Sequence, residues 1–299
     1  MADLTVGLVG TGRMGTALGE RILAAGHPLT VYNRTPDRTK SLVDAGARAV
    51  GSPAEVAGAA RLVLSVVNDD AAVDAVYTGP DGLLRGAATG TVFVEASTVR
   101  TSTITALAAR VRAAGAGLVD APMAGPPAAA RAGRLLVMVG GDLADVDTAR
   151  PVLETYARRI VHCGPSGSGT TMKLVLMAPM AVYFAGLAEG LAIGGQLGLD
   201  RAMMLDVILD SHGAPPVLRD RAELLLGAER PPGFEVSGVR KDLRAIMATA
   251  QDAGVPASTA AAALGQYAGA TINGFGDRDL VFIVDYVRRL AQGKTDHLD

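Results

Sequence analysis

Short apolar runs alternate with longer mixed segments along the first half of the chain. Each run is almost continuously apolar and rich in Val and Leu, which is typical of parallel strands covered on both faces. Between the first two runs lies MGTALGERILAAGH, a helical pattern that ends near a glycine. Strands that alternate with helices in this way predict an α/β domain with a doubly wound parallel sheet. We expect strands at residues 4–10, 28–33, 61–67, 90–97, 116–122 and 135–141.

The pattern changes after Cys163. The stretch GPSGSG (164–169) is typical of a loop, and little of the remaining sequence resembles a strand. We therefore predict an α/β domain over residues 1–163 and an all-helical domain over residues 164–299. Helices are expected at residues 169–197, 200–211, 216–227, 235–253, 256–272 and 277–292.

One stretch of the second half is uncharged from Leu174 to Ala188. A spanning helix needs about 20 apolar residues, whereas this stretch is shorter, contains Pro179 and ends at Glu189. We interpret it as part of a long helix that is buried between domains or subunits.

Composition narrows the class of protein further. With 49% hydrophobic and 19% charged residues, the chain is expected to form a buried core rather than to be disordered. Its net charge of −2 gives no electrostatic reason to expect nucleic acid or an anionic membrane as a partner. We expect a small-molecule substrate instead.

Cysteine and histidine usage argues against disulfides and metals. Cys163 is the only cysteine, and the histidines at 27, 162, 212 and 297 lack the spacing of metal ligands. The amino terminus, MADLTVGLVG, lacks the basic-then-apolar build of a secretion signal. We expect a cytoplasmic protein without a dedicated metal site.

The stretch VGLVGTGRMG places three glycines between the first expected strand and the first expected helix. Gly10 permits a tight turn, Gly12 lets the backbone approach a pyrophosphate, and Gly15 lets the helix pack against the strand. The first N–H groups of that helix and its dipole would bind the phosphates. We predict a dinucleotide site here, against the alternative of a purely structural turn. Its expected cofactor contacts are Gly10, Thr11, Gly12, Arg13 and Met14.

Three polar residues, Asn33, Arg34 and Thr35, follow the second expected strand. In NAD-binding domains a carboxylate at about this position holds the adenosine ribose. A carboxylate would repel a 2′-phosphate, whereas an amide, a guanidinium and a hydroxyl suit phosphate oxygens. We therefore predict NADP(H) in preference to NAD(H). The alternative is that Arg34 and Thr35 are solvated residues of an ordinary turn.

With these motifs, the chain resembles the β-hydroxyacid dehydrogenase family, which includes 3-hydroxyisobutyrate dehydrogenase, tartronate semialdehyde reductase and, more distantly, 6-phosphogluconate dehydrogenase. The resemblance covers nearly all 299 residues, and ordered matches are more specific than any single one. It implies a nucleotide-binding domain, a long interdomain helix and a helical domain, usually paired in a homodimer. The matching segments are GLVGTGRMG (7–15), AGHPLTVYNRT (25–35), EAST (95–98), DAPMAG (120–125), GRLLVMVGG (133–141), GPSGSGTTMK (164–173), KDL (241–243) and GFGDRD (274–279).

The resemblance makes Lys173 the catalytic residue. When a hydride moves between the nicotinamide and a carbinol carbon, the oxygen must gain or lose a proton. A positioned ammonium can transfer that proton and stabilise the developing alkoxide. From the sequence alone, the alternative is a snorkelling or capping lysine before an apolar run.

The resemblance also assigns further cofactor contacts. It places Val67, Asn68 and Thr98 beside the nicotinamide and its ribose, and it makes Lys241 a residue that reaches over the cofactor from the helical domain. For Asn68 and Lys241 the alternative is an exposed polar residue without a role in binding.

The expected substrate site departs from the family pattern. Where the family usually has Asp-Ala-Pro-Val-Ser-Gly-Gly, this chain has DAPMAGP (120–126). Ala124 therefore replaces a serine that would bind a substrate carboxylate, although Gly125 still offers its backbone N–H. Met177 replaces an asparagine one turn after the lysine. Because buried polar contacts discriminate strongly, their loss predicts a larger or less polar substrate.

Three functions remain open at this point. The first is an NADPH-dependent reductase or dehydrogenase acting on a β-hydroxyacid, a semialdehyde or a related carbonyl. The second is an imine reductase or reductive aminase, which the apolar Ala124 and Met177 favour but the retained Lys173 disfavours. The third is a protein that binds the nucleotide without catalysis.

Overall fold

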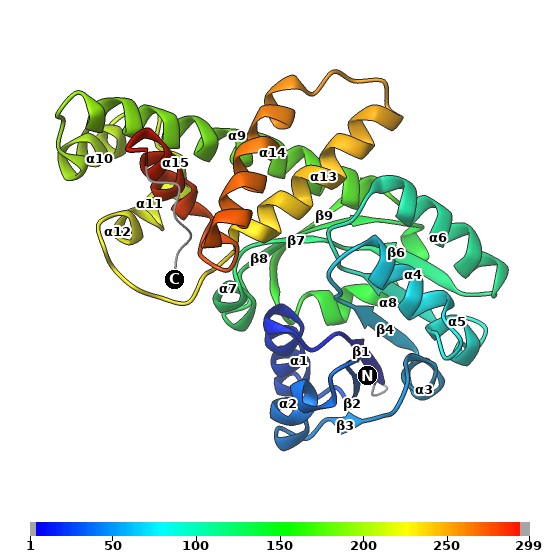
Figure 1. The fold of residues 1–299 in the computed structure, drawn as a ribbon. Helices are drawn as coiled ribbons and strands as arrows, with labels where there is room; N and C mark the ends of the chain where they lie inside the picture. The colour runs from blue at the N-terminus through cyan, green and yellow to red at the C-terminus, as the bar shows by residue number, and fades with distance from the viewer. Residues whose placement is uncertain (1–3, 294–299) are drawn as a thin grey trace. The chain divides into compact units, whose positions relative to one another are not determined.

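The computed structural model describes residues 4–293. The chain forms two compact units that meet between Val175 and Leu176. The unit boundary falls within a single long helix, α9 (Ser168–Gln196), whereas the sequence-based boundary falls after Cys163. Each unit is described in turn, and Figure 1 shows their elements.

The first unit is built on one sheet, and within residues 4–293 this sheet has nine strands. Their order is β3-β2-β1-β4-β5-β6-β8-β7, with β9 paired to β8. The chain therefore winds in one direction from β1 to β3 and in the other from β4 to β6, as in doubly wound folds. The strands are β1 Val6–Val9, β2 Leu29–Tyr32, β3 Arg48–Ala49, β4 Leu62–Ser65, β5 Val92–Glu95, β6 Gly117–Asp120, β7 Met123–Ala124, β8 Leu135–Gly140 and β9 Ala157–Gly164.

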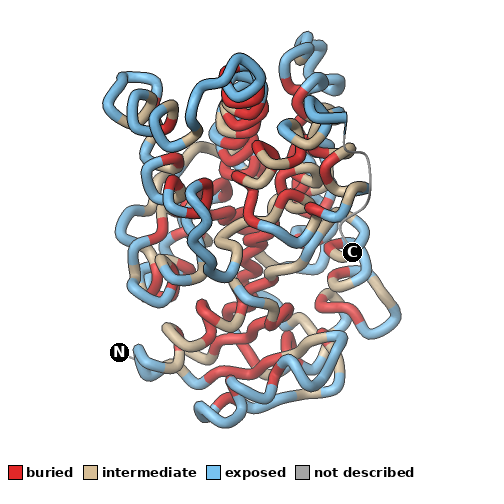
Figure 2. The backbone as a smooth tube through the Cα atoms, turned by 60° about the vertical axis from the view of Figure 1, so that its left-hand side comes forward, coloured by how far each residue is buried: buried red, intermediate tan, exposed pale blue. Residues whose placement is uncertain are grey.

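Helices cover both faces of the sheet, which explains the continuous apolar runs. Alternate residues of one strand enter different cores: Val92 and Val94 join one, and Phe93 joins the other. Strands β1, β4 and β5 are buried at every position, and Figure 2 shows continuous buried segments in the chain. One core includes α1 Arg13–Ala24, α2 Lys40–Asp44, α7 Pro127–Arg131 and α8 Leu143–Leu153; the other includes α3 Pro53–Ala59, α4 Asp70–Thr78, α5 Leu83–Gly86 and α6 Thr101–Ala113.

The prediction of an α/β domain with a mainly parallel sheet is confirmed, with one correction. Strand β8 runs antiparallel to β6 and β7. Strands β3, β7 and β9 were not predicted from the sequence. Strand β9, with the sequence ARRIVHCG, lies partly exposed and carries polar side chains, so it has no apolar run to detect.

The second unit is helical, as predicted. Helices α13 and α14 lie side by side in it. The helix expected at 216–227 is interrupted at Arg221, whose backbone is not helical, and the helix expected at 277–292 begins only after Asp279 caps a short 3-10 turn. The elements are α10 Arg201–Asp210, α11 Pro216–Arg219, α12 Ala222–Leu225, α13 Val236–Asp252, α14 Ser258–Ala270, a π-helical turn η2 Thr271–Phe275, the 3-10 turn η3 Leu280–Phe282 and α15 Ile283–Ala291.

Helix α9 lies where the long helix was expected, at residues 169–197, and contains the whole uncharged stretch. At 29 residues it is long and apolar enough to cross a membrane, by length and composition only. Core helices of soluble proteins share this length and composition. In its most apolar window 39% of the residues are buried, while Val175 and Ile193 are mostly exposed. The helix therefore has apolar side chains that the single chain leaves exposed.

Candidate functional site

The fold brings most of the predicted cofactor residues of the first unit to one edge of the sheet. Gly10, Asn33, Val67 and Thr98 follow the ends of β1, β2, β4 and β5, respectively. These strands are parallel, so their carboxyl ends lie along the same edge. In doubly wound sheets ligands bind in the crevice at this edge, where the strand order reverses. The reversal lies between β1 and β4.

The glycine turn after β1 has the steric properties expected of a phosphate-binding loop. Gly10 has a φ of 92°, and a side chain there would overlap the carbonyl group of Val66. A side chain at Gly15 would overlap the carbonyl group of Gly10, so helix α1 packs directly on the turn. At Gly12 an added Cβ would meet no protein atom within 4 Å. The space beside Gly12 is therefore open and could be occupied by a ligand.

The amino terminus of α1 is electrostatically suited to a phosphate. Gly12 is its N-cap and supplies no capping side chain, and the first turn contains no acidic residue. Thr11 is buried, while Arg13 is exposed and Met14 is half-buried. Because backbone N–H groups and the helix dipole favour an anion here, the residues fit the diphosphate of a dinucleotide.

Asn33 has a structural role that was not predicted from the sequence. Its Oδ1 accepts a hydrogen bond from the Thr11 backbone N–H at 3.0 Å, and its Nδ2 donates to the Thr35 carbonyl oxygen at 2.9 Å. The side chain thus ties the glycine turn to the end of β2. Arg34 and Thr35 are exposed beside it. Arg38, a second exposed cation in the short 3-10 helix Pro36–Thr39, was not singled out from the sequence.

The loops after β4 and β5 are joined by two hydrogen bonds. The Val67 N–H donates to Ser97 Oγ at 2.8 Å, and the Ser97 N–H donates to Glu95 Oε1 at 2.8 Å. Asn68 is exposed and Thr98 is half-buried. Ser97 and Glu95 belong to the EAST motif but had no role predicted for them, because the Val67 contact joins residues 30 positions apart.

Lys173 lies in the second turn of α9 and is only 9% exposed. The start of this helix is held by a buried carboxylate: Asp120 Oδ1 accepts from the Gly167 N–H at 2.7 Å, and Oδ2 accepts from the Thr170 N–H at 2.6 Å. Burial raises the pKa of Asp120, and both N–H groups act against that rise. Gly169 lets the helix approach the sheet closely, since its Cβ would lie 2.5 Å from the Met138 carbonyl oxygen. The fold therefore fixes Lys173 through Asp120.

The remaining predicted residues lie on several elements. Ala124 ends β7 and is half-buried, and Gly125 follows it with a φ of 133° and is exposed. Met177, one turn after Lys173 on α9, is buried. Lys241, on α13, pairs with the neighbouring Asp242 at 2.9 Å. Met177 and Lys241 belong to the second unit, and the substrate contact of Met177 and the cofactor contact of Lys241 stay predictions.

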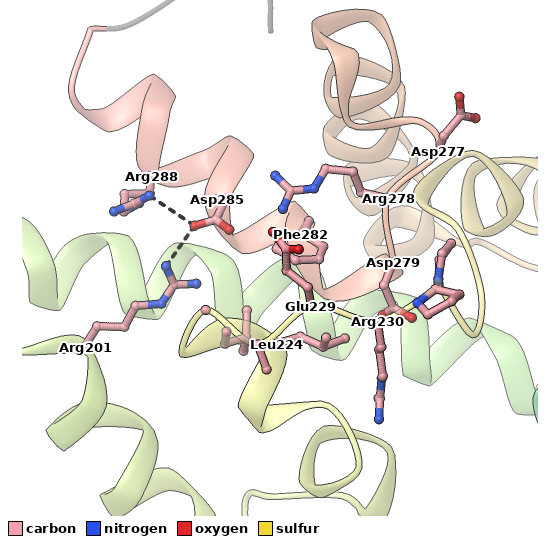
Figure 3. A pocket seen from close by; sticks show the side chains of 15 residues that line it. Arg201, Leu224, Glu229, Arg230, Asp277, Arg278, Asp279, Phe282, Asp285 and Arg288 are labelled. Atoms are coloured by element: carbon pink, nitrogen blue, oxygen red, sulfur yellow. Dashed lines mark hydrogen bonds and ion pairs between the residues drawn. The ribbon is translucent and has the colours of Figure 1, made fainter.

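A separate open pocket of about 830 Å³ lies in the second unit (Figure 3). In its lining, Asp285 pairs with Arg201 at 2.8 Å and with Arg288 at 3.2 Å. The Arg278 guanidinium lies 3.6 Å from the centre of the Phe282 ring. The lining contains none of the predicted site residues. None of the predicted cofactor or substrate contacts therefore belongs to this pocket.

Acidic and histidine side chains do not gather into a metal site in the part of the chain that the structure describes. Between residues 4 and 293, no group of three or more His, Cys, Asp or Glu side chains could hold a metal ion. His297 lies outside the described residues.

Comparisons with known proteins match the chain in both halves. Residues 5–164 match the family model of the NAD-binding domain of 6-phosphogluconate dehydrogenase, and residues 167–287 match the model for NAD-binding of NADP-dependent 3-hydroxyisobutyrate dehydrogenase. The chain belongs to the β-hydroxyacid dehydrogenase family. Members of this family are NAD(P)-dependent oxidoreductases, and this chain is one.

Individual members of the β-hydroxyacid dehydrogenase family cover nearly the whole chain. The 3-hydroxyisobutyrate dehydrogenase of Pseudomonas aeruginosa is 34% identical over 268 residues, which are 87% of this chain and 89% of that protein. The solved 3-hydroxyisobutyrate dehydrogenase of Salmonella typhimurium is 26% identical, with a TM-score of 0.85 over 95% of this chain and all of that one. An imine reductase from Pseudomonas sp. shares the fold, with 23% identity and a TM-score of 0.61. The match covers 95% of this chain and 99% of the imine reductase.

Proposed function

We propose that the protein is an NADP-dependent reductase or dehydrogenase that acts on a carbonyl or hydroxyl carbon of a small hydroxyacid-like or less polar substrate. The observation that carries the proposal is the buried Lys173, held at the start of α9 by Asp120 in the same unit as the dinucleotide edge. A bound nicotinamide would supply or accept the hydride. The chain would supply the proton.

Lys173 is suited to that role by its burial. A charged ammonium away from water interacts more strongly with a developing alkoxide than one in solution. As a carbonyl is reduced, Lys173 would give its proton to the oxygen; in the reverse direction it would take the hydroxyl proton as a base. This role distinguishes the proposal from a capping or snorkelling lysine, which would keep its head group in water.

Cofactor preference should depend on Arg34. Its exposed guanidinium can bind a 2′-phosphate, and such charge-assisted contacts are worth about 1.5–3 kcal/mol. We expect NADPH to bind at least about tenfold more tightly than NADH. Arg34→Ala should remove most of the difference and leave NADH affinity nearly unchanged, as measured by fluorescence titration. Arg48→Ala, in the neighbouring strand β3, is the control for a general loss of positive charge and should keep the preference. Equal affinities in the wild type would show that the 33–35 turn does not read the phosphate.

Substrate choice should depend on Ala124 and Met177. Restoring the family pattern with Ala124→Ser and Met177→Asn should raise kcat/KM for short 3-hydroxy acids. Each restored contact should stabilise the transition state by about 1–3 kcal/mol. The same change should reduce activity on the native substrate, since the new polar groups would face apolar atoms. The unmodified enzyme could already turn over 3-hydroxyisobutyrate with a kcat/KM of about 10⁵ M⁻¹s⁻¹, which is within the ordinary range for enzymes. That result would show that Ala124 and Met177 do not alter the specificity of the family.

A second candidate function is imine reduction with NADPH. Ala124 and Met177 favour it, because an apolar pocket suits an imine better than a carboxylate. The retained Lys173 speaks against it, since the imine reductases that the chain resembles usually carry an aspartate, a tyrosine or another residue there. A less favoured third possibility is nucleotide binding without catalysis.

We also propose that the protein is a homodimer in which the partner covers α9. Val175 and Ile193 on this helix are 57% and 62% exposed in the single chain, and Leu197, directly after its end, is 79% exposed. Because a helix that is apolar on all sides must be buried on all sides, these side chains need a cover. Analytical ultracentrifugation should give a dimer at micromolar concentration. A stable monomer under those conditions would contradict the proposal.

A substrate panel tests the proposed function. Semialdehydes, simple carbonyls and cyclic imines would each be incubated with NADPH, and the loss of absorbance at 340 nm would be followed. The proposal predicts the highest kcat/KM for a carbonyl compound. Turnover of imines alone would favour the second function, and cofactor binding without any turnover would favour the third.

A further inference from the structure

Glu95 is an ionisable residue that the proposed reaction does not use, although it lies at the cofactor edge. It is the last residue of β5 and is fully buried. One oxygen, Oε1, accepts the Ser97 N–H, and Ser97 Oγ in turn accepts the N–H of Val67. Through Ser97 the carboxyl group therefore supports both loops that follow β4 and β5.

The surroundings of the second oxygen are polar but incompletely bonded. Glu95 Oε2, Ser65 Oγ and Tyr77 Oη are all buried, and none has a hydrogen-bond partner with good geometry among the groups that the structure describes. Burial raises the pKa of Glu95 to about 7, and the neutral groups of Ser97, Ser65 and Tyr77 oppose the rise. Both protonation states are therefore accessible near neutral pH.

Ionisable groups also lie on the elements next to Glu95. Tyr77 projects from α4, and burial raises its pKa well above the usual value, so it stays neutral. Asp120 is the register partner of Glu95 on β6, and its two oxygens are bound to backbone N–H groups of Gly167 and Thr170. The first cation after Glu95 along the chain, Arg100, pairs with Asp70 at 3.3 Å.

The strand order indicates which part of a dinucleotide faces this carboxyl group. The adenosine end belongs beside β2, where Arg34 lies, and the diphosphate belongs at the α1 terminus after β1. The other half must then extend over the ends of β4 and β5, which continue the sheet in the opposite direction. Its nicotinamide ring is positively charged when oxidised and neutral when reduced, so a buried carboxylate nearby stabilises the oxidised form.

We propose that Glu95 is a positioning residue of the cofactor site that releases its proton when the oxidised cofactor binds and keeps it when the reduced cofactor binds. The inference rests on the proposed binding of NADP(H) in this edge. Below neutral pH, Glu95 is a neutral hydrogen-bonding group under the two loops. Above it, the carboxylate favours NADP+ over NADPH. The enzyme thereby links its cofactor redox state to pH at a group separate from Lys173.

The test measures the dissociation constants of NADP+ and NADPH between pH 6 and pH 8. Their ratio is used because the 2′-phosphate, which titrates near pH 6, is common to both cofactors and its effect cancels. In the wild type the ratio of the NADP+ constant to the NADPH constant should fall by about three- to tenfold as pH rises through 7. Calorimetry in two buffers of different ionisation enthalpy should show proton release on NADP+ binding and little on NADPH binding.

Two variants assign the effect to Glu95. Glu95→Gln copies the neutral form and should bind both cofactors with a ratio that no longer depends on pH. Tyr77→Phe removes a hydroxyl that lowers the pKa of Glu95, so the midpoint of the change should move to higher pH. A pH-independent ratio in the wild type, or an unchanged pH dependence in Glu95→Gln, would overturn the inference. Failure of the wild type to bind either cofactor would instead contradict the proposed function.

Discussion

Lys173→Ala is expected to reduce kcat by at least 10²–10⁴-fold, the usual contribution of a positioned proton donor, while NADPH affinity stays within about threefold of the wild type. The reason is the burial of the ammonium, which is 9% exposed at the start of α9. Without it, the alkoxide would have to form with neither a proton nor a compensating charge, so the loss of electrostatic stabilisation adds to the loss of proton transfer.

The control for this prediction is Lys173→Met, which keeps an unbranched side chain in the same buried position. It should be as inactive as Lys173→Ala but closer to the wild type in stability. The methionine fills the space of the lysine alkyl chain, whereas alanine leaves a cavity there. Steady-state rates and thermal melts separate the two effects. If either variant keeps more than about a tenth of the wild-type kcat, proton transfer occurs elsewhere, and the imine-reductase alternative gains support.

Asp120→Ala is expected to destabilise the first unit by about 2–5 kcal/mol, the range for leaving buried N–H groups without their acceptor. The carboxylate accepts two hydrogen bonds, from Gly167 at 2.7 Å and Thr170 at 2.6 Å, and both donors lie at the start of α9. Because Lys173 follows in the next turn, kcat should also fall in the folded variant. Urea unfolding measures the first effect, and rates at low temperature, where the variant is folded, measure the second.

Asp120→Asn provides the comparison for that prediction. Its amide retains one acceptor oxygen and places an NH₂ group toward the second N–H, so we expect an intermediate loss of stability. Thr148→Val, which removes an exposed hydroxyl on α8, should be close to neutral. An Asp120→Ala protein with unfolding free energy within about 0.5 kcal/mol of the wild type would show that Asp120 does not hold α9.

The elements that could be predicted from the sequence are those whose burial shows in their own pattern of apolar residues. Strand β4, with LVLS buried on both faces, has the apolar run that such burial requires. Strand β9 is sheltered by pairing with β8 while its side chains stay polar and partly exposed, so its structure is decided by a distant neighbour. The antiparallel direction of β8 likewise depends on how the chain returns to β6, which no local pattern encodes.

The candidate site divides in the same way. The glycine turn was readable because its three conformational demands fall on nearby residues of one segment. The roles of Asn33, Asp120 and Glu95 were not, because each contact partner is set by the fold. Asn33 bonds Thr11 across 22 positions, and Asp120 bonds Gly167 across 47. A polar residue at a buried strand end, as at Glu95 and Asp120, was the available signal in the sequence.

In the proposed reaction, a hydride moves from NADPH to a carbonyl carbon of the substrate. The most direct measurement uses NADPH that carries deuterium at both C4 positions of the nicotinamide, so that either hydride is labelled, with the best carbonyl compound of the substrate panel. Mass spectrometry and proton NMR of the product then locate the label. We predict one deuterium on the new carbinol carbon, formed by the wild type and not by Lys173→Ala. An unlabelled product, or deuterium transfer to imines but to no carbonyl compound, would contradict the proposal.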